Sequence, residues 1–151
     1  MITKYQKSLV KGDPEKVKVA IIGSRIYENK RKIKDTIFKL KQMFGDKLEI
    51  VSGGAGAGAD KYAKKYALEL GVDYREFNPA FTNKNLYSVM PESYYGKQYH
   101  VTQLFARNEL IAKYCDHMIA FIHSASTTSG SDHAVKMALK HKKPVVIINE
   151  L

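Results

Sequence analysis

A glycine-rich stretch, VSGGAGAGAD at 51–60, follows an apolar run and ends in an acidic residue. Glycine lets a ligand approach the backbone closely, and the free amides at the start of a helix attract phosphate. Two other segments, GSR at 23–25 and ASTTSGSD at 125–132, are also small and polar. All three lie between an apolar run and a predicted helix, so they are expected at one edge of a parallel sheet. We therefore predict a site for a phosphorylated ligand at that edge.

The predicted ligand-binding residues share small size, hydrogen-bonding groups or charge. They are Gly23, Ser24, Arg25, Ser52, Gly53, Gly54, Ala55, Gly56, Gly58, Asp60, Arg107, Asn108, Ser126, Thr127, Thr128, Ser129, Gly130, Ser131 and Asp132. Arg25 directly follows a strand end, where its planar guanidinium group suits a phosphate, although a surface ion pair is the alternative. Arg107 lies on an apolar-flanked helix face, a position that requires either a ligand or a buried acid as its partner.

The rest of the chain predicts the elements that position these residues. Apolar, β-branched segments predict five strands, at 16–24, 48–54, 72–77, 117–124 and 144–149. Helical spacing predicts helices at 29–44, 59–70, 101–113 and 132–140. Strands that alternate with helices need crossover connections, which favour a mostly parallel sheet covered on both faces. The prediction is an α/β, Rossmann-like, doubly wound fold.

The predicted organisation is a single domain over residues 1–151, with an N-terminal extension at 1–15. An irregular, tyrosine-rich insertion is expected at 81–100. Its tyrosines favour an interface with another subunit, combined with a partial lid over a ligand. They are Tyr87, Tyr94, Tyr95 and Tyr99.

Other ligand-binding signatures match less well. The P-loop pattern fails because no Gly-Lys-Ser/Thr follows the glycines. The dinucleotide pattern GxGxxA fits Gly54, Gly56 and Ala59, with Glu76 twenty positions beyond Gly56, but it follows the second strand instead of the first. NAD therefore stays a minor alternative. The histidines and Cys115 lack metal-ligand spacing, so neither a metal nor a cofactor is predicted.

Composition limits the classes of protein and of partner. The single cysteine, the absence of a secretory signal and the lack of an apolar run of about 20 residues predict a cytoplasmic protein without a membrane partner. The formal net charge of +10 fits nucleic acid, phosphorylated small molecules or a solvated basic surface. Much of this charge falls within the predicted helix at 29–44, which favours the solvated surface.

Four motifs resemble the SLOG superfamily, which includes the lonely-guy phosphoribohydrolases and the DprA/Smf DNA-processing proteins. They are GSR at 23–25, SGGAGAGAD at 52–60, RNELIA at 107–112, and TSGSDHAVKMA followed by KKPVVII. The resemblance is closest to the small, stand-alone YspA-like branch. It implies a Rossmann-like fold that binds nucleotides or nucleotide-derived molecules and that forms homo-oligomers.

The resemblance to the lonely-guy enzymes also implies a possible activity, cleavage of a nucleoside monophosphate at its N-glycosidic bond by an Arg and a Glu. Arg107 resembles their Arg, whereas His133 and Ala134 stand where their Glu is expected. Asp132 or Glu109 would have to supply the carboxylate. Three hypotheses follow. The favoured one is a nucleotide sensor or sequestering protein, and the alternatives are an N-glycosidase and a DprA-like binder of single-stranded DNA.

Overall fold

The computed structural model describes residues 15–55, 57–77, 101–124 and 130–150. Strands and helices alternate along these segments, which confirms the predicted α/β pattern. The strands are β1 (Val17–Gly23), β2 (Leu48–Ser52), β3 (Asp73–Glu76), β4 (His117–His123) and β5 (Val145–Glu150). The helices are α2 (Lys30–Phe44), the short 3-10 helix η1 (Gly45–Lys47), α3 (Gly58–Glu69), α4 (Val101–Tyr114) and α5 (Gly130–Lys140).

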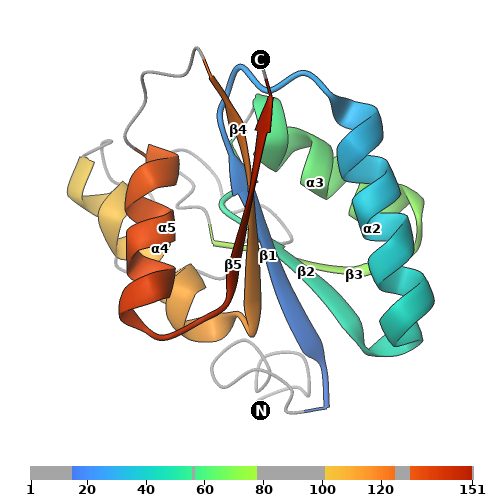
Figure 1. The fold of residues 1–151 in the computed structure, drawn as a ribbon. Helices are drawn as coiled ribbons and strands as arrows, with labels where there is room; N and C mark the ends of the chain where they lie inside the picture. Colours follow the sequence, from blue (N-terminus) through green and yellow to red (C-terminus); the bar gives the residue numbers. More distant parts are fainter. Residues whose placement is uncertain (1–14, 56, 78–100, 125–129, 151) are drawn as a thin grey trace, which may run out of the picture.

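The strands form one parallel sheet in the order β3-β2-β1-β4-β5 (Figure 1). The central strand β1 pairs with β2 on one side and with β4 on the other, so that Val19 lies opposite both Ile50 and His117. The chain builds outward from β1 to β3 and then returns to the centre to add β4 and β5. The carboxyl ends of β1 and β4 therefore border the point where the strand order reverses, the usual ligand position in such sheets.

Helices cover both faces of the sheet, with α2 and α3 on one side and α4 and α5 on the other (Figure 1). Successive residues of a strand point to opposite faces. Ile21 accordingly joins the core under α2 and α3, and Ile22 joins the core under α4 and α5. This arrangement confirms the predicted Rossmann-like, doubly wound fold.

Local sequence explains where the helices on the first face begin and end. The Asn29 side chain accepts a hydrogen bond from the Lys32 amide and caps α2. Ile33 and Ile37, one helical turn apart, are the buried residues of α2, as their spacing predicts. After α3, Gly71 adopts a positive φ of 70°, which fits its predicted place at the helix end.

Two predicted boundaries were wrong in ways that affect the site. Strand β2 ends at Ser52, two residues earlier than predicted, because the chain turns away at Gly54 with a φ of 73°. Helix α5 begins at Gly130, two residues before the predicted start at Asp132. Asp132 therefore lies in the first turn of α5. None of the helices in the described part of the chain is long and apolar enough to cross a membrane.

Candidate functional site

Ser24, at the end of β1, joins the two halves of the sheet to α3. Its amide donates to the Phe121 carbonyl of β4 at 3.0 Å, and its hydroxyl accepts from the His123 amide at 3.1 Å. Its carbonyl accepts from the amides of Tyr27 and Ala59, each at 3.2 Å. The Ala59 amide is one of the free donors of the first turn of α3. Ser24 therefore uses its polar groups to fix the loop of the predicted site in place.

Two glycines of the loop after β2 are required by the packing of the chain itself. Gly58 has a φ of 68°, and a Cβ there would lie 2.1 Å from the Ser24 carbonyl oxygen. Gly54 has a φ of 73°, and a Cβ there would lie 2.4 Å from the Glu76 side chain. Both the left-handed backbone and the close approach exclude other residues. Contacts within the protein are therefore sufficient to explain why glycine is needed at positions 54 and 58.

The backbone of Gly53 lies between side chains from two different helices. A Cβ at Gly53 would lie 3.0 Å from Asp60 Oδ2 of α3 and 3.1 Å from Arg107 Cζ of α4. Arg107 Nη1 donates to the Gly53 carbonyl at 3.3 Å, and the Ala55 amide donates to Asp60 Oδ2 at 3.3 Å. The loop after β2 thus connects an acid on one face of the sheet to an arginine on the other.

Asp60 is buried and its carboxyl group is only partly satisfied. Oδ1 accepts no hydrogen bond from any residue that the structure describes. Burial raises the pKa of Asp60 to about 6, against the lowering effects of Arg107, the Ala55 amide and Arg25. Nearby Glu76 raises it further. The charge of this carboxyl group therefore changes between about pH 5 and 7.

Glu76 forms a second buried acidic position, directly beneath Gly54. Its Oε1 accepts from the Tyr74 hydroxyl at 2.9 Å and lies 3.4 Å from Lys64 Nζ. Burial and the neighbouring Glu76 raise the pKa of Tyr74 above its ordinary value. The position of Glu76 twenty residues after Gly56 was a sequence signal for this residue. Nothing in the sequence pointed to Tyr74 or Lys64, because their contact with Glu76 depends on the packing of β3 and α3.

The structure brings Arg25 to the same place as Asp60 and Arg107. Arg25 is exposed at the end of β1 and makes no hydrogen bond or ion pair with the described residues. Its charge lowers the pKa of Asp60, and its backbone lies against Gly58 at the start of α3. The predicted site residues that come together are thus Ser24, Arg25, Gly53, Asp60 and Arg107.

Three other predicted site residues make contacts within and between α4 and α5. Asn108 is buried, and its Nδ2 lies 3.1 Å from His133 Nδ1. The two carboxylates proposed for catalysis lie in exposed ion pairs. Glu109 is 3.7 Å from Lys113 and 3.6 Å from His141, and Asp132, whose side chain is 66% exposed, is 3.1 Å from Lys136. A catalytic role for Glu109 or Asp132 stays a prediction.

Part of the predicted site lies outside the described residues. This applies to Gly56 and to the loop residues Ser126, Thr127, Thr128 and Ser129. It applies equally to the tyrosine-rich segment at 81–100. Gly130 and Ser131 begin α5 and follow that loop directly.

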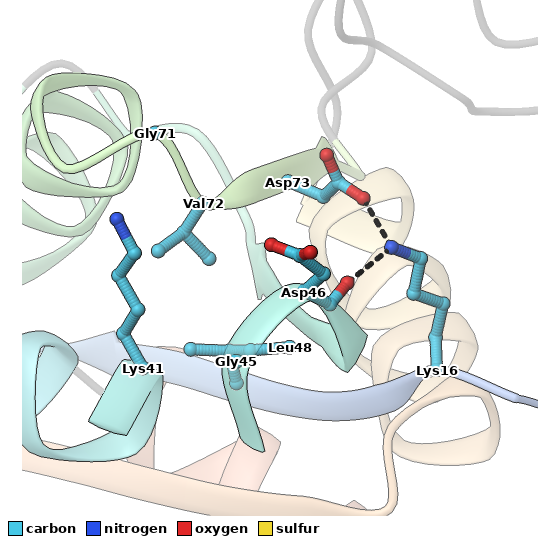
Figure 2. Close-up of a pocket in the computed structure, with 8 residues that line it drawn as sticks. All are labelled: Lys16, Lys41, Gly45, Asp46, Leu48, Gly71, Val72 and Asp73. Atoms are coloured by element: carbon cyan, nitrogen blue, oxygen red, sulfur yellow. Dashed lines mark hydrogen bonds and ion pairs between the residues drawn. The ribbon is translucent and has the colours of Figure 1, made fainter. Parts of the chain in front are cut away.

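A separate hollow of about 280 Å³ lies near the amino ends of β1 and β3 (Figure 2). Its two lysines already have partners within the protein. Lys16 Nζ donates to Asp73 Oδ2 at 2.6 Å and to the Asp46 carbonyl at 2.7 Å, and Lys41 Nζ donates to the Leu70 carbonyl at 2.5 Å. The Lys41 contact joins the ends of α2 and α3, and the Lys16 contacts join the start of β1 to η1 and β3. None of the predicted ligand-binding residues lines the hollow.

Solved structures with a similar fold include a molybdenum cofactor binding protein from the phototrophic bacterium Rippkaea orientalis. It has a TM-score of 0.64 and 18% identity over 92% of this chain and 80% of that one. The molybdenum cofactor carrier protein of Chlamydomonas reinhardtii has a TM-score of 0.62 and 22% identity over 89% and 78% of the respective chains. At these identities the similarity confirms the Rossmann-like fold alone.

A comparison at the level of sequence identifies the family. No curated protein matches the sequence. A family model described as DNA recombination-mediator protein A matches residues 9–150. This match agrees with the SLOG-type motifs, while the YspA-like branch stays a prediction. Because the match covers nearly all of the sequence, the chain belongs to the DNA recombination-mediator protein A family, whose domain is of the SLOG type.

Proposed function

We propose that this protein binds a phosphorylated small molecule, a nucleotide or a nucleotide-derived signal, at the carboxyl ends of β1 and β2. It would act as a sensor or as a sequestering protein. The observation that carries the proposal is the convergence of Arg25 and Arg107 on the buried carboxylate of Asp60. The neighbouring Glu76 carboxylate pairs with Lys64, so the two guanidinium groups against Asp60 leave positive charge beside the first turn of α3. An anion placed there would be attracted both by that charge and by the helix amides.

Arg25 is the residue best placed to contact the ligand. It follows the strand end at the reversal of strand order, and its side chain is exposed. Arg107 already donates to the Gly53 carbonyl and is partly buried, so it would support the loop and contribute charge. A planar guanidinium group binds phosphate through paired hydrogen bonds, which a lysine cannot do.

The titles of the similar structures suggest one further ligand to test. Both proteins are described as binding or carrying the molybdenum cofactor. Their low identity transfers no binding residue to this chain, so the cofactor belongs in the ligand panel beside nucleotides, cyclic dinucleotides and ADP-ribose derivatives.

The test is native mass spectrometry and calorimetry of the purified protein with this panel. The decisive variant is Arg25→Gln, with Arg31→Gln as a matched control, because Arg31 is exposed on α2 and carries the same charge. Loss of a charge-assisted hydrogen bond of about 1.5–3 kcal/mol predicts an affinity at least about tenfold weaker for Arg25→Gln. Arg31→Gln should change the affinity less than about twofold. Equal effects of the two variants, or no bound ligand at all, would contradict the proposal.

The same samples test the hydrolase prediction. Free base and ribose phosphate would appear in the mass spectra if Asp132 or Glu109 supported cleavage. Both carboxylates now lie in exposed ion pairs, so we expect the ligand to be retained unchanged.

Single-stranded DNA is a second candidate, favoured by the family match and by the net charge of +10. Binding to an oligothymidine should then weaken steeply with salt, in proportion to the number of phosphates contacted. A small-molecule site should show a much shallower salt dependence. Comparing the two slopes on one preparation separates the candidates.

A further inference from the structure

The two edges of the sheet are built differently. Strand β3 forms one edge, and it is short and polar. Its residues Tyr74, Arg75 and Glu76 are buried, and the exposed Asp73 pairs with Lys16. Strand β5 forms the other edge and reads VVIINE, with no charge before its last residue. Soluble proteins normally protect an edge strand with charge, proline or a covering segment, as β3 does.

The middle of β5 exposes large apolar side chains on both faces of the sheet. Val146 is 57% exposed and Ile147 is 51% exposed. As successive strand residues they point to opposite faces. Their neighbours confirm this, because Ile148 packs with the core under α2 and α3, whereas Val145 packs with the core under α4 and α5.

The shape of this surface limits what can cover it. The register of β5 places residues 145–150 against β4, so the peptide groups on its outer side face away from the sheet. A helix or a small molecule could cover one apolar face, but it could not pair with the backbone of the edge. Another strand satisfies the peptide groups and covers both Val146 and Ile147.

We propose that β5 pairs antiparallel with β5 of a second copy of this chain, which joins two sheets into one continuous sheet. The strand is complementary to itself in that orientation. The exposed Lys142 precedes the strand and Glu150 ends it, so antiparallel pairing brings the basic start of one strand toward the acidic end of the other. Residues 144–149, between Lys143 and Glu150, carry no charge, so the pairing segment itself brings no like charges together in two copies with a net charge of +10. The inference is independent of the proposed ligand.

The first test is sedimentation velocity of the full chain over a range of concentrations. The wild-type protein should approach twice the monomer mass of 17.1 kDa. Ile147→Lys places a charge in the centre of the paired strands and should give a monomer at the same concentration. Met43→Lys is the matched control, since Met43 is 71% exposed on α2, far from β5 in sequence, and this variant should stay dimeric. Thermal melts by circular dichroism show whether each variant is folded. Since residue 147 is exposed in the monomer, we expect the Ile147→Lys monomer to be folded.

Hydrogen exchange provides a second, variant-free measurement. The amides of residues 145–150 should become protected as the concentration rises, in step with the mass. A monomer at every concentration would overturn the proposal. A dimer that persists in Ile147→Lys, or protection of β5 that does not change with concentration, would also overturn it. The former would place the interface elsewhere, and the latter would mean that the chain covers its own edge.

Discussion

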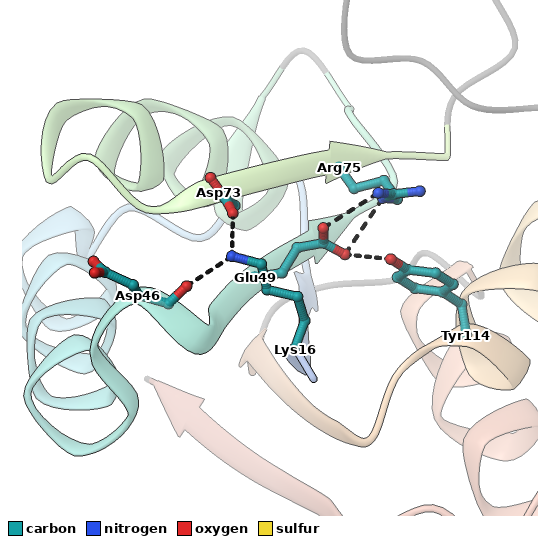
Figure 3. Close-up of polar contacts among 6 residues, drawn as sticks. All are labelled: Lys16, Asp46, Glu49, Asp73, Arg75 and Tyr114. Atoms are coloured by element: carbon teal, nitrogen blue, oxygen red, sulfur yellow. Dashed lines mark hydrogen bonds and ion pairs between the residues drawn. The ribbon is translucent and has the colours of Figure 1, made fainter. Parts of the chain in front are cut away.

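Two clusters of buried charged residues lie along the same pair of strands, β2 and β3. They differ in whether every carboxylate oxygen has a hydrogen-bond donor. In the first, Glu49 of β2 forms an ion pair with Arg75 of β3 and accepts a hydrogen bond from Tyr114 of α4 (Figure 3). Arg75 Nε lies 3.3 Å from Glu49 Oε1, Nη2 donates to Oε2 at 3.4 Å, and the Tyr114 hydroxyl donates to Oε1. The guanidinium carbon also lies 5.1 Å from the centre of the Tyr114 ring. Both carboxylate oxygens thus have donors.

The second cluster, near the carboxyl ends of the strands, contains Asp60, Arg107 and Glu76. Here Oδ1 of the buried Asp60 has no donor among the described residues, and its pKa is raised to about 6. A complete buried network stabilises one arrangement of the chain, whereas an incomplete one costs stability. The Glu49 cluster therefore stabilises the folded state. The buried Asp60 carboxylate, with one oxygen that lacks a donor among the described residues, lowers stability at the candidate site. The following predictions test that difference.

The largest expected effect comes from breaking the complete cluster. Arg75→Met removes both ion-pair contacts and leaves Glu49 buried without its counter-charge. We expect the free energy of unfolding to fall by about 3–5 kcal/mol, measured by urea denaturation. Arg31→Met, an exposed position on α2, should change it by less than about 0.5 kcal/mol. A loss below about 1 kcal/mol for Arg75→Met would mean that the Glu49 cluster does not stabilise the fold as argued.

The next effect concerns the pH dependence that Asp60 imposes. The pKa of Asp60 is raised from its ordinary value of 3.8 to about 6 in the folded protein, so the folded state binds more protons in that pH window. Its contribution to stability is therefore complete below about pH 4 and is lost as the pH rises through about 6, by up to about 3 kcal/mol. Asp60→Asn should remove this fall in stability, measured by urea denaturation from pH 4 to 7.

The control for Asp60 is Asp132→Asn, which changes an exposed carboxylate in the first turn of α5. Its pH profile should follow that of the wild-type protein. If the Asp60→Asn profile also matches the wild type, Asp60 is not the group that couples folding to pH.

The smallest effect comes from removing one donor of the complete cluster. Tyr114→Phe keeps the ring, which lies 5.4 Å from Phe77, but leaves Glu49 with one hydrogen bond fewer. We expect a loss of about 1–2 kcal/mol in the free energy of unfolding. Tyr62→Phe is the control, because the Tyr62 hydroxyl has no hydrogen bond to the described residues, and it should cost less than about 0.5 kcal/mol. Equal losses in the two variants would show that the hydroxyl of Tyr114 adds nothing.

Local sequence determined the fold of this protein to a large extent. The helical spacing of Ile33 and Ile37 and the apolar run before Gly23 are properties of neighbouring residues, and they predicted elements that the structure confirms. The edge of the sheet that carries the candidate site also followed from the sequence, since in a parallel sheet the carboxyl end of each strand lies at one edge. Helix starts were off by up to two residues, as at Gly130, because capping depends on groups outside the helix.

Only the tertiary structure shows which contacts the predicted site residues make within the protein. Ser24 and the glycines at 54 and 58, whose ligand-binding role stays a prediction, are also fixed by contacts with β4, Glu76 and the end of β1. The loop at Gly53 lies between Asp60 and Arg107 and so connects two helices on opposite faces of the sheet. Such contacts depend on strand register and on helix packing between residues far apart in the chain. Local spacing carries no information about these distances, so the raised pKa of Asp60 could be found only in the folded protein.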